Sequence, residues 1–317
     1  MGKKYLVVHN TCGIAHREGM TNIETRLPCH ENTDHYILGI KSILHQKFDG
    51  EFDVINSNCM GTEESREALL FHFKDKIMFN MVNENQPVNV TFNQSCRLAT
   101  EINGLYDAYI YVDSGVVLEK ADHLQAISDM YDEYPDSGLV SLLSENDNGS
   151  EQWHVPITPG RTVVPVGQAL NLHVMSWTKE MYTAFGGKLM PDIFRAYCTE
   201  STFSFLAAAV KKKWVAVTDS RVIHKKGMDM GSSGFRTKHP WDDLYLVPYS
   251  VLDVCAKGHP LGLGYEECQR ICMHDVTKYD DNGFIMDNGE LANFIKEELF
   301  LKPEYLDYDK IKYEFIR

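Results

Sequence analysis

The sequence predicts an α/β protein in which helices flank a central sheet. Short apolar runs typical of buried strands alternate along the chain with longer segments whose apolar residues recur at helical spacing. Turn-forming residues separate these segments, and no internal repeat interrupts the alternation. Because strands that alternate with helices usually pair in parallel, we expect a mixed, mainly parallel sheet.

The elements before residue 120 follow this alternation closely. Strands are expected at residues 4–8, 51–57, 76–82 and 107–113, and helices at residues 33–48, 62–75 and 87–102. The first helix has apolar Tyr36, Ile40 and Ile43 at helical spacing, and Thr33 or Asp34 can cap its start. The third helix contains β-branched residues, but it must return the chain to the next parallel strand.

The alternation continues less regularly after residue 120. Helices are expected at residues 120–135, 178–187 and 199–213, strands at residues 138–144, 168–177 and 214–224, and a loop at residues 145–167. Residues 227–235, "GMDMGSSGF", have the composition of a mobile flap, and the chain beyond Pro240 is expected to be mainly helical. We therefore expect one domain at residues 1–226, followed at residues 227–317 by a flexible loop and a C-terminal helical extension.

Charge and composition limit the partners and the location. A net charge of −14 repels nucleic acid, and basic residues gather only between Lys211 and Lys238, which is enough to hold a small polyanion such as a diphosphate. No apolar run approaches the roughly 20 residues of a membrane span, and the run near the start is too short for a signal peptide. A cytoplasmic protein is expected. Its scattered cysteines do not indicate a disulfide scaffold.

The stretch "YIYVDSG" places Asp113 at the end of a buried strand and follows it with two turn-forming residues, Ser114 and Gly115. A strand that ends this way usually presents its carboxylate to a crevice. Taken alone the pattern is not specific, because acidic residues are common at strand ends. Its position in a longer series of motifs favours a functional role for Asp113.

That series resembles the GT-A glycosyltransferases, particularly the inverting family 2 group, over roughly residues 3–226. Asn93 stands where the family has a helical asparagine, and "YIYVDSG" occupies the place of the Asp-x-Asp motif. The other segments that carry the resemblance are, in chain order, "VVHNT", "SILHQKF", "DVINSNCMGTEES", "FGGKLMPDIF", "CTESTFS" and "RVIHKK". The resemblance implies a GT-A-type nucleotide-binding fold.

The resemblance also implies an activity and roles for particular residues. A sugar would pass from a nucleotide diphosphate sugar to an acceptor hydroxyl, with Glu200 as the base that deprotonates the acceptor. The acceptor would be a glycan, with another biomolecule as the alternative. Asp113 and His224 would bind a divalent cation, Mn²⁺ or Mg²⁺, and Trp177 and Asp192 would contact the acceptor. The donor would be framed by Asn10, Thr11, Ser57, Asn93, Asp113, Ser114, Lys225 and Lys226.

Two departures from the family pattern affect the donor site. Gly115 stands where the family has the second acid of Asp-x-Asp, so one oxygen ligand of the metal is lost. Either Asp113 and His224 still hold the ion with the phosphates, or Lys225 and Lys226 neutralise the diphosphate without a metal. Ser57 stands near the family's uracil-binding acid, so the nucleotide base stays open.

Other roles fit the same residues. Glu200 could complement a helix dipole, His224 could be structural, and Trp177 could pack in the core. The chain as a whole could be a catalytically reduced nucleotide-sugar-binding or scaffolding protein. A nucleotidyltransferase would need a glycine-rich basic loop after the first strand, which "HNTCGIAHREGM" matches poorly. The extension could shape the acceptor side or form a homo-oligomer contact.

Overall fold

The fold is taken from a computed structural model, which describes residues 2–12, 33–59, 61–83, 86, 88–145, 154–165, 170, 173–192, 202–224 and 307–317. The strands are β1 (Lys3–Cys12), β2 (Gly50–Cys59), β3 (Met78–Val82), β4 (Ala108–Val112), β5 (Val116–Val117), β6 (Ser137–Ser144), β7 (Val155–Thr158), β8 (Arg161–Val164), β9 (Val174–Thr178), β10 (Lys213–His224) and β11 (Tyr313–Ile316). The helices are α1 (Thr33–Leu44), α2 (Glu63–Phe73), α3 (Val88–Asn103), α4 (His123–Glu133), α5 (Lys179–Ala184) and α6 (Phe203–Ala209).

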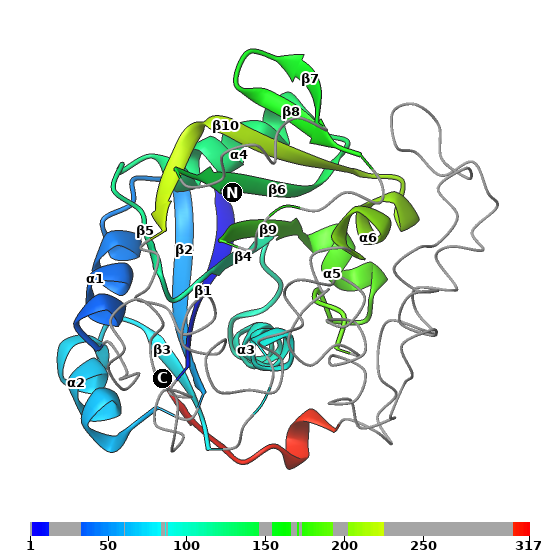
Figure 1. Ribbon diagram of the computed structural model, residues 1–317. Helices are drawn as coiled ribbons and strands as arrows, with labels where there is room; N and C mark the ends of the chain where they lie inside the picture. Colours follow the sequence, from blue (N-terminus) through cyan, green and yellow to red (C-terminus); the bar gives the residue numbers. More distant parts are fainter. Residues whose placement is uncertain are drawn as a thin grey trace, which may run out of the picture.

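The strands join in one mixed sheet with the order β11-β3-β2-β1-β4-β9-β6-β10-β8-β7, and β5 pairs with β10 beside this path (Figure 1). β1 pairs in parallel with both β2 and β4, β2 with β3, and β6 with β10. β9 runs against its two neighbours, β4 and β6. Among the described strands four pairs are parallel and six are antiparallel. The chain therefore has a mixed sheet with parallel strands, flanked by helices, as the sequence predicts for a GT-A-type fold.

Helices cover both faces of the sheet (Figure 1). Apolar residues of α1, α2 and α4 form one core with Tyr5 and Val7 of β1. Apolar residues of α3, α5 and α6 form the other core with Leu6 and Val8 of the same strand. Because successive side chains of a strand point to opposite faces, a strand buried on both sides must be apolar throughout, which explains the run "YLVV".

Two segments differ from the sequence-based expectation. β7 and β8 form an antiparallel hairpin at the sheet edge within the segment expected to be a loop. The end of the chain forms a 3-10 turn at Tyr308–Lys310, and β11 then pairs antiparallel with β3. These last residues belong to the sheet domain, whereas the expected flap at residues 227–235 and the helices after Pro240 lie outside the described residues.

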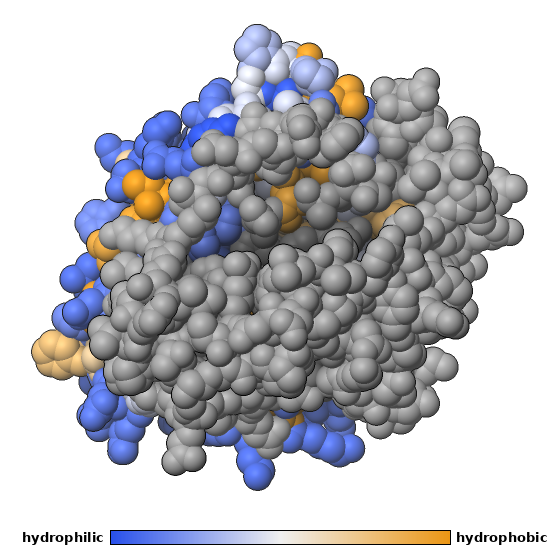
Figure 2. Space-filling view, viewed as in Figure 1, coloured by the Kyte–Doolittle hydropathy of each residue, from blue (hydrophilic) through white to orange (hydrophobic). Residues whose placement is uncertain are grey.

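The described surface on the side shown in Figure 2 is mostly hydrophilic, with a few apolar patches. Large apolar side chains are exposed at Leu38, Phe71, Ile102, Leu105, Val155 and Ile157. Within the described ranges no helix combines the length and the apolar character that crossing a membrane requires.

Candidate functional site

Asp113 lies at the carboxyl end of β4, at the start of a tight turn. The backbone N–H of Val116 donates to the Asp113 carbonyl at 3.0 Å, which closes the turn around Ser114 and Gly115. The hydroxyl of Tyr111, on the same face of the strand, donates to Asp113 Oδ1 at 2.9 Å. The other carboxylate oxygen points toward His224, and the side chain is 24% exposed. The strand therefore presents a partly open, oriented carboxylate, as the sequence predicts.

His224 reaches this carboxylate because the turn leads directly into β5. β5 pairs antiparallel with the end of β10, and His224 lies opposite Val116. Residues directly opposite in an antiparallel pair share a face, so the end of β10 is held beside the turn. His224 Nε2 lies 3.5 Å from Asp113 Oδ2, and the imidazole is buried. The two residues singled out as metal ligands are thus neighbours in space.

A second histidine, His173, joins the pair. It comes directly before β9, whose Val174 lies opposite Val112 of β4, and its carbonyl accepts from the Asp113 N–H at 2.9 Å. The imidazole rings of His173 and His224 lie with their centroids 4.1 Å apart. Sequence reasoning missed His173. The only available signal was a histidine immediately before an apolar strand, in "LHVMSW".

The three side chains could hold one metal ion. One ligand atom from each of Asp113, His173 and His224 lies within 4.8 Å of the other two. Two ligand atoms bound to one ion at about 2.1 Å are at most about 4.2 Å apart. Small rotations of the side chains would therefore bring the three ligand atoms within reach of one ion. Carboxylate oxygen and imidazole nitrogen are both common ligands of divalent cations. The donor set and its spacing therefore fit an ion.

The "SILHQKF" segment bonds to the residues that follow β5. The side chain of Gln46, two residues after the end of α1, donates to the carbonyls of Leu118 and Lys120, at 3.4 and 2.8 Å, just after β5. The hydroxyl of Ser42 accepts from the Leu118 N–H at 3.0 Å. The serine and glutamine of this motif thus fix the segment that carries β5, and with it the position of the Asp113 turn.

His9 of β1 lies beside Val112 of β4, the residue that precedes Asp113. It is fully buried, and burial lowers its pKa to about 4, although the nearby Asp113 carboxylate acts in the opposite direction. Its Nδ1 lies 3.2 Å from the side-chain nitrogen of Asn56, whereas its Nε2 has no hydrogen-bond partner among the described residues. His9 is therefore a neutral, enclosed imidazole.

Asn10, Thr11 and Ser57 lie at the adjacent ends of β1 and β2, where the sequence predicts nucleotide contacts. All three are buried, and their side chains bond to protein groups. Asn10 Nδ2 donates to Val88 O at 3.3 Å, Thr11 bonds to the Ser57 carbonyl at 3.5 Å, and Ser57 donates to Thr91 O at 3.4 Å. Asn10 and Ser57 thus bond to the start of α3 and Thr11 bonds to β2, and the contact of all three with a nucleotide stays a prediction.

Asn93 has a different role from the one expected. Its oxygen accepts the N–H groups of Leu189 and Met190, and its nitrogen donates to Met190 O and to the Tyr308 hydroxyl. An amide has two donors and two acceptor positions, and all four are occupied. Asn93 therefore fixes the loop after α5 and has no group left to frame a nucleotide.

Asp192 and Trp177 are also corrected. The Asp192 side chain is completely enclosed and pairs with Lys188 at 2.8 Å. Trp177 is fully buried, between the rings of Phe92 and Phe203. Neither side chain can reach an acceptor, because protein atoms surround both. For Trp177, core packing was the other role that the sequence allowed. Ser114 is half-buried within the turn, and Glu200, Lys225 and Lys226 lie outside the described residues.

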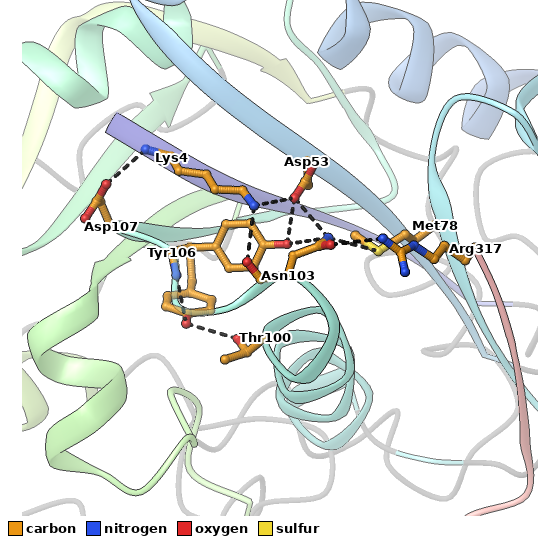
Figure 3. Close-up of polar contacts among 9 residues, drawn as sticks. Lys4, Asp53, Met78, Thr100, Asn103, Tyr106, Asp107 and Arg317 are labelled. Atoms are coloured by element: carbon orange, nitrogen blue, oxygen red, sulfur yellow. Dashed lines mark hydrogen bonds and ion pairs between the residues drawn. The ribbon is translucent and has the colours of Figure 1, made fainter. Parts of the chain in front are cut away.

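A cavity of about 440 Å³ lies near the amino ends of β2 and β3, away from the carboxyl ends where Asp113 lies. Its lining includes Asp53, near the start of β2, together with Lys74, Asp75 and Arg317. Figure 3 shows the neighbouring network, in which Asp53 accepts hydrogen bonds from Tyr106 and Asn103 at 2.8 and 3.1 Å. Ligands of open α/β sheets bind at the carboxyl ends of the strands, so this cavity is on the wrong edge for the chemistry of Asp113.

No protein-family model matches the chain, and no curated protein has a similar sequence. Solved structures do match. TarS of S. aureus, residues 1–349, is 12% identical, with 85% of this chain and 69% of that chain covered and a TM-score of 0.49. The mannosyltransferase PcManGT of Pyrobaculum calidifontis, solved with GDP-Man and Mn²⁺, is 15% identical, with a TM-score of 0.47. That match covers 69% of this chain but 56% of the mannosyltransferase, little more than half its length.

Proposed function

We propose that this chain is an inverting, cation-dependent glycosyltransferase that takes a sugar from a nucleotide diphosphate sugar. The observation that carries the proposal is the convergence of Asp113 and His224 at the carboxyl edge of the sheet, with Nε2 and Oδ2 3.5 Å apart. These residues are far apart in the sequence, and the motif order singles them out. A parallel sheet presents ligands at this edge.

The residues at the site suit a leaving diphosphate. The Tyr111 hydroxyl orients the Asp113 carboxylate, and the partial exposure of that carboxylate leaves room for a phosphate oxygen beside it. When bound here, a divalent cation supplies positive charge that stabilises the departing diphosphate. Lys225 and Lys226 follow His224 directly in the sequence and would add charge on the same side.

The proposed transfer is a single displacement. The acceptor oxygen forms a bond to the anomeric carbon while the bond from that carbon to the diphosphate oxygen breaks, and the diphosphate leaves with the electron pair. Glu200 takes the proton of the acceptor hydroxyl, and the anomeric configuration inverts. The acceptor is proposed to be a glycan hydroxyl, because the net charge of −14 disfavours a nucleic acid. The cytoplasm is the proposed location.

The first experiment measures nucleotide binding and then transfer. Isothermal titration calorimetry with UDP and GDP, with and without Mn²⁺, should show binding that the ion strengthens. A screen of sugar nucleotides should then reveal hydrolysis or transfer. Asp113→Asn should lose the ion-dependent part of the binding. The matched control is Asp107→Asn at the other end of β4, where the carboxylate pairs with Lys179, and it should bind normally.

The outcomes separate the proposal from its rival. Glu200→Gln should still bind the nucleotide but should transfer the sugar much more slowly, because the acceptor keeps its proton. Tight nucleotide binding with no turnover of any donor by the unaltered chain would favour a nucleotide-sugar-binding protein. No binding of any nucleoside diphosphate, with or without the ion, would refute both.

A further inference from the structure

We propose that His173 replaces the acid lost at Gly115, and that the resulting centre of two imidazoles and one carboxylate selects divalent transition-metal ions over Mg²⁺. The inference concerns the ion site of the proposed function. Ion binding can be measured without any sugar nucleotide, so the two can fail separately.

The third ligand comes from His173, because the turn after Asp113 does not supply one. Gly115 has no side chain to offer, although it follows Asp113 by only two residues. His173 reaches the same place from the neighbouring strand, because β9 runs antiparallel to β4 and its backbone bonds to that of Asp113 at 2.9 Å. A cross-strand neighbour thus supplies the donor that the turn lacks.

The three donors differ in their exposure to solvent. His173 and His224 are buried, 9% and 6% exposed, whereas the Asp113 side chain is 24% exposed. The imidazoles therefore form the inner wall, and the carboxylate lies toward solvent. Three protein ligands leave coordination positions open for outside oxygens. The Asp113–His224 separation of 3.5 Å is longer than the 2.7–2.9 Å of a charge-assisted hydrogen bond and suits two ligands of one ion.

The donor atoms, two imidazole nitrogens and one carboxylate oxygen, determine which ions the site prefers. Mg²⁺ prefers an all-oxygen, near-octahedral shell and gives up its water reluctantly. Imidazole nitrogen suits Zn²⁺, Cu²⁺, Fe²⁺ and Ni²⁺, and affinity at a given nitrogen and oxygen site rises from Mn²⁺ to Cu²⁺. A site with two nitrogens and one oxygen should therefore bind Mg²⁺ weakly, Mn²⁺ better and Co²⁺ better still. An acid at residue 115 would have shifted this preference toward Mg²⁺.

The test uses the full chain, stripped of metal with a chelator. Binding of Mn²⁺ is followed by the loss of the electron paramagnetic resonance signal of the aqueous ion, with Mg²⁺ as competitor. We expect Mn²⁺ to bind about tenfold or more tighter than Mg²⁺. Co²⁺ should give a visible absorption spectrum that His173→Ala changes.

Substitutions at residue 173 decide the role of the histidine. His173→Ala should weaken Mn²⁺ binding about tenfold or more, and His173→Asp should lower the ratio of Mn²⁺ to Mg²⁺ affinity. His154→Ala is the matched control, because His154 is a similarly buried histidine, bonded to Thr162 of β8, and its loss should leave ion binding unchanged. Circular dichroism establishes that each variant folds.

Three results would overturn the inference. They are equal affinity for Mg²⁺ and Mn²⁺, unchanged Mn²⁺ binding by a folded His173→Ala variant, and absence of ion binding by the unaltered chain. Selective ion binding without sugar transfer would leave the inference standing and would count against the proposed activity alone.

Discussion

The hydroxyl group of Tyr308 donates a hydrogen bond of 2.9 Å to the enclosed carboxylate of Asp192. The same hydroxyl accepts from Asn93 of α3 at 3.3 Å, and β11 follows a few residues later and pairs with β3. The end of the chain is therefore a clasp, residues 307–317, that fixes the loop after α5 against α3. In the sequence this loop precedes the segment that contains Glu200.

Removing the hydroxyl in Tyr308→Phe should destabilise the protein. The buried Asp192 carboxylate would lose this hydrogen bond and keep its ion pair with Lys188, at 2.8 Å. Leaving a buried charged group short of a hydrogen bond costs about 1–3 kcal/mol. Urea unfolding followed by circular dichroism measures the change in the free energy of unfolding.

Tyr134→Phe is the matched control for the clasp. Its hydroxyl bonds to Thr158 at 2.9 Å at an exposed position, so water replaces the lost contact. The change should be within about 0.5 kcal/mol, as for most surface substitutions. Equal effects of the two substitutions would show that the clasp bond contributes nothing of its own.

The ends of the strands were predictable from sequence, because the pattern there is local. Apolar runs that stop at Asp113 and His224 mark where two strands leave the core. Parallel strands end on the same edge of a sheet, so polar residues at those ends gather without further information. The motif order then indicated that these two belong to one site, and the structure brings them together.

The remaining contacts depend on register and packing, which a single sequence does not encode locally. His173 reaches the site only because the reversed strand β9 inserts beside β4 in one particular register. Asn93 and Trp177 both lie where the sequence pattern predicts ligand contacts. The Asn93 amide instead bonds to backbone groups and to the Tyr308 hydroxyl, and Trp177 fills the core. The pairing of β11 with β3 joins segments more than two hundred residues apart.

Stability should fall as the solution becomes acidic, in part because of His9. In the folded chain burial lowers its pKa to about 4, whereas the unfolded value is 6.5. The unfolded chain therefore binds the proton first, and stability is lost as the pH falls from 6.5 toward 4, with no further loss from this group below that range. The shift corresponds to about 3 kcal/mol at most.

Urea unfolding at a series of pH values from about 7.5 to about 4.5 measures this effect. His9→Gln removes the titrating group, so its free energy of unfolding should fall less steeply across that range, whatever its stability at neutral pH. His123 has a pKa of about 4 for the same reason, so part of the slope should persist in this variant. An unchanged slope in His9→Gln would show that His9 does not titrate as a buried group.

Trp177→Phe tests whether this residue belongs to the core or to an acceptor site. The indole packs against Phe92 and Phe203, so its loss should leave a cavity and lower stability by about 1–3 kcal/mol. Nucleotide affinity and sugar turnover per folded molecule should change little. The control is Phe71→Ala, where the ring is 84% exposed and truncation should cost about 0.5 kcal/mol or less. A selective loss of turnover at unchanged stability would restore the acceptor role.

Gly39→Ala should destabilise the protein although alanine favours a helix by about 1 kcal/mol over glycine. An added Cβ would lie 2.8 Å from His9 Nε2 and 3.2 Å from the Val116 carbonyl. Neither neighbour yields easily, because His9 is enclosed and Val116 belongs to β5. Overpacking of this kind costs about 1–3 kcal/mol. Since Val116 lies opposite His224, displacement of β5 should also weaken Mn²⁺ binding, which the resonance titration measures.

The double variant Gly39→Ala/His9→Ala identifies the cause of that loss. If the methyl group collides with the imidazole, the added methyl should cost less in the His9→Ala background than in the unaltered chain, and the two free-energy changes should not add. Strict additivity would place the collision at the Val116 carbonyl instead. A Gly39→Ala protein more stable than the unaltered chain would mean that His9 can rotate away, and that α1 does not press on the strand behind Asp113 as tightly as the 2.8 Å approach requires.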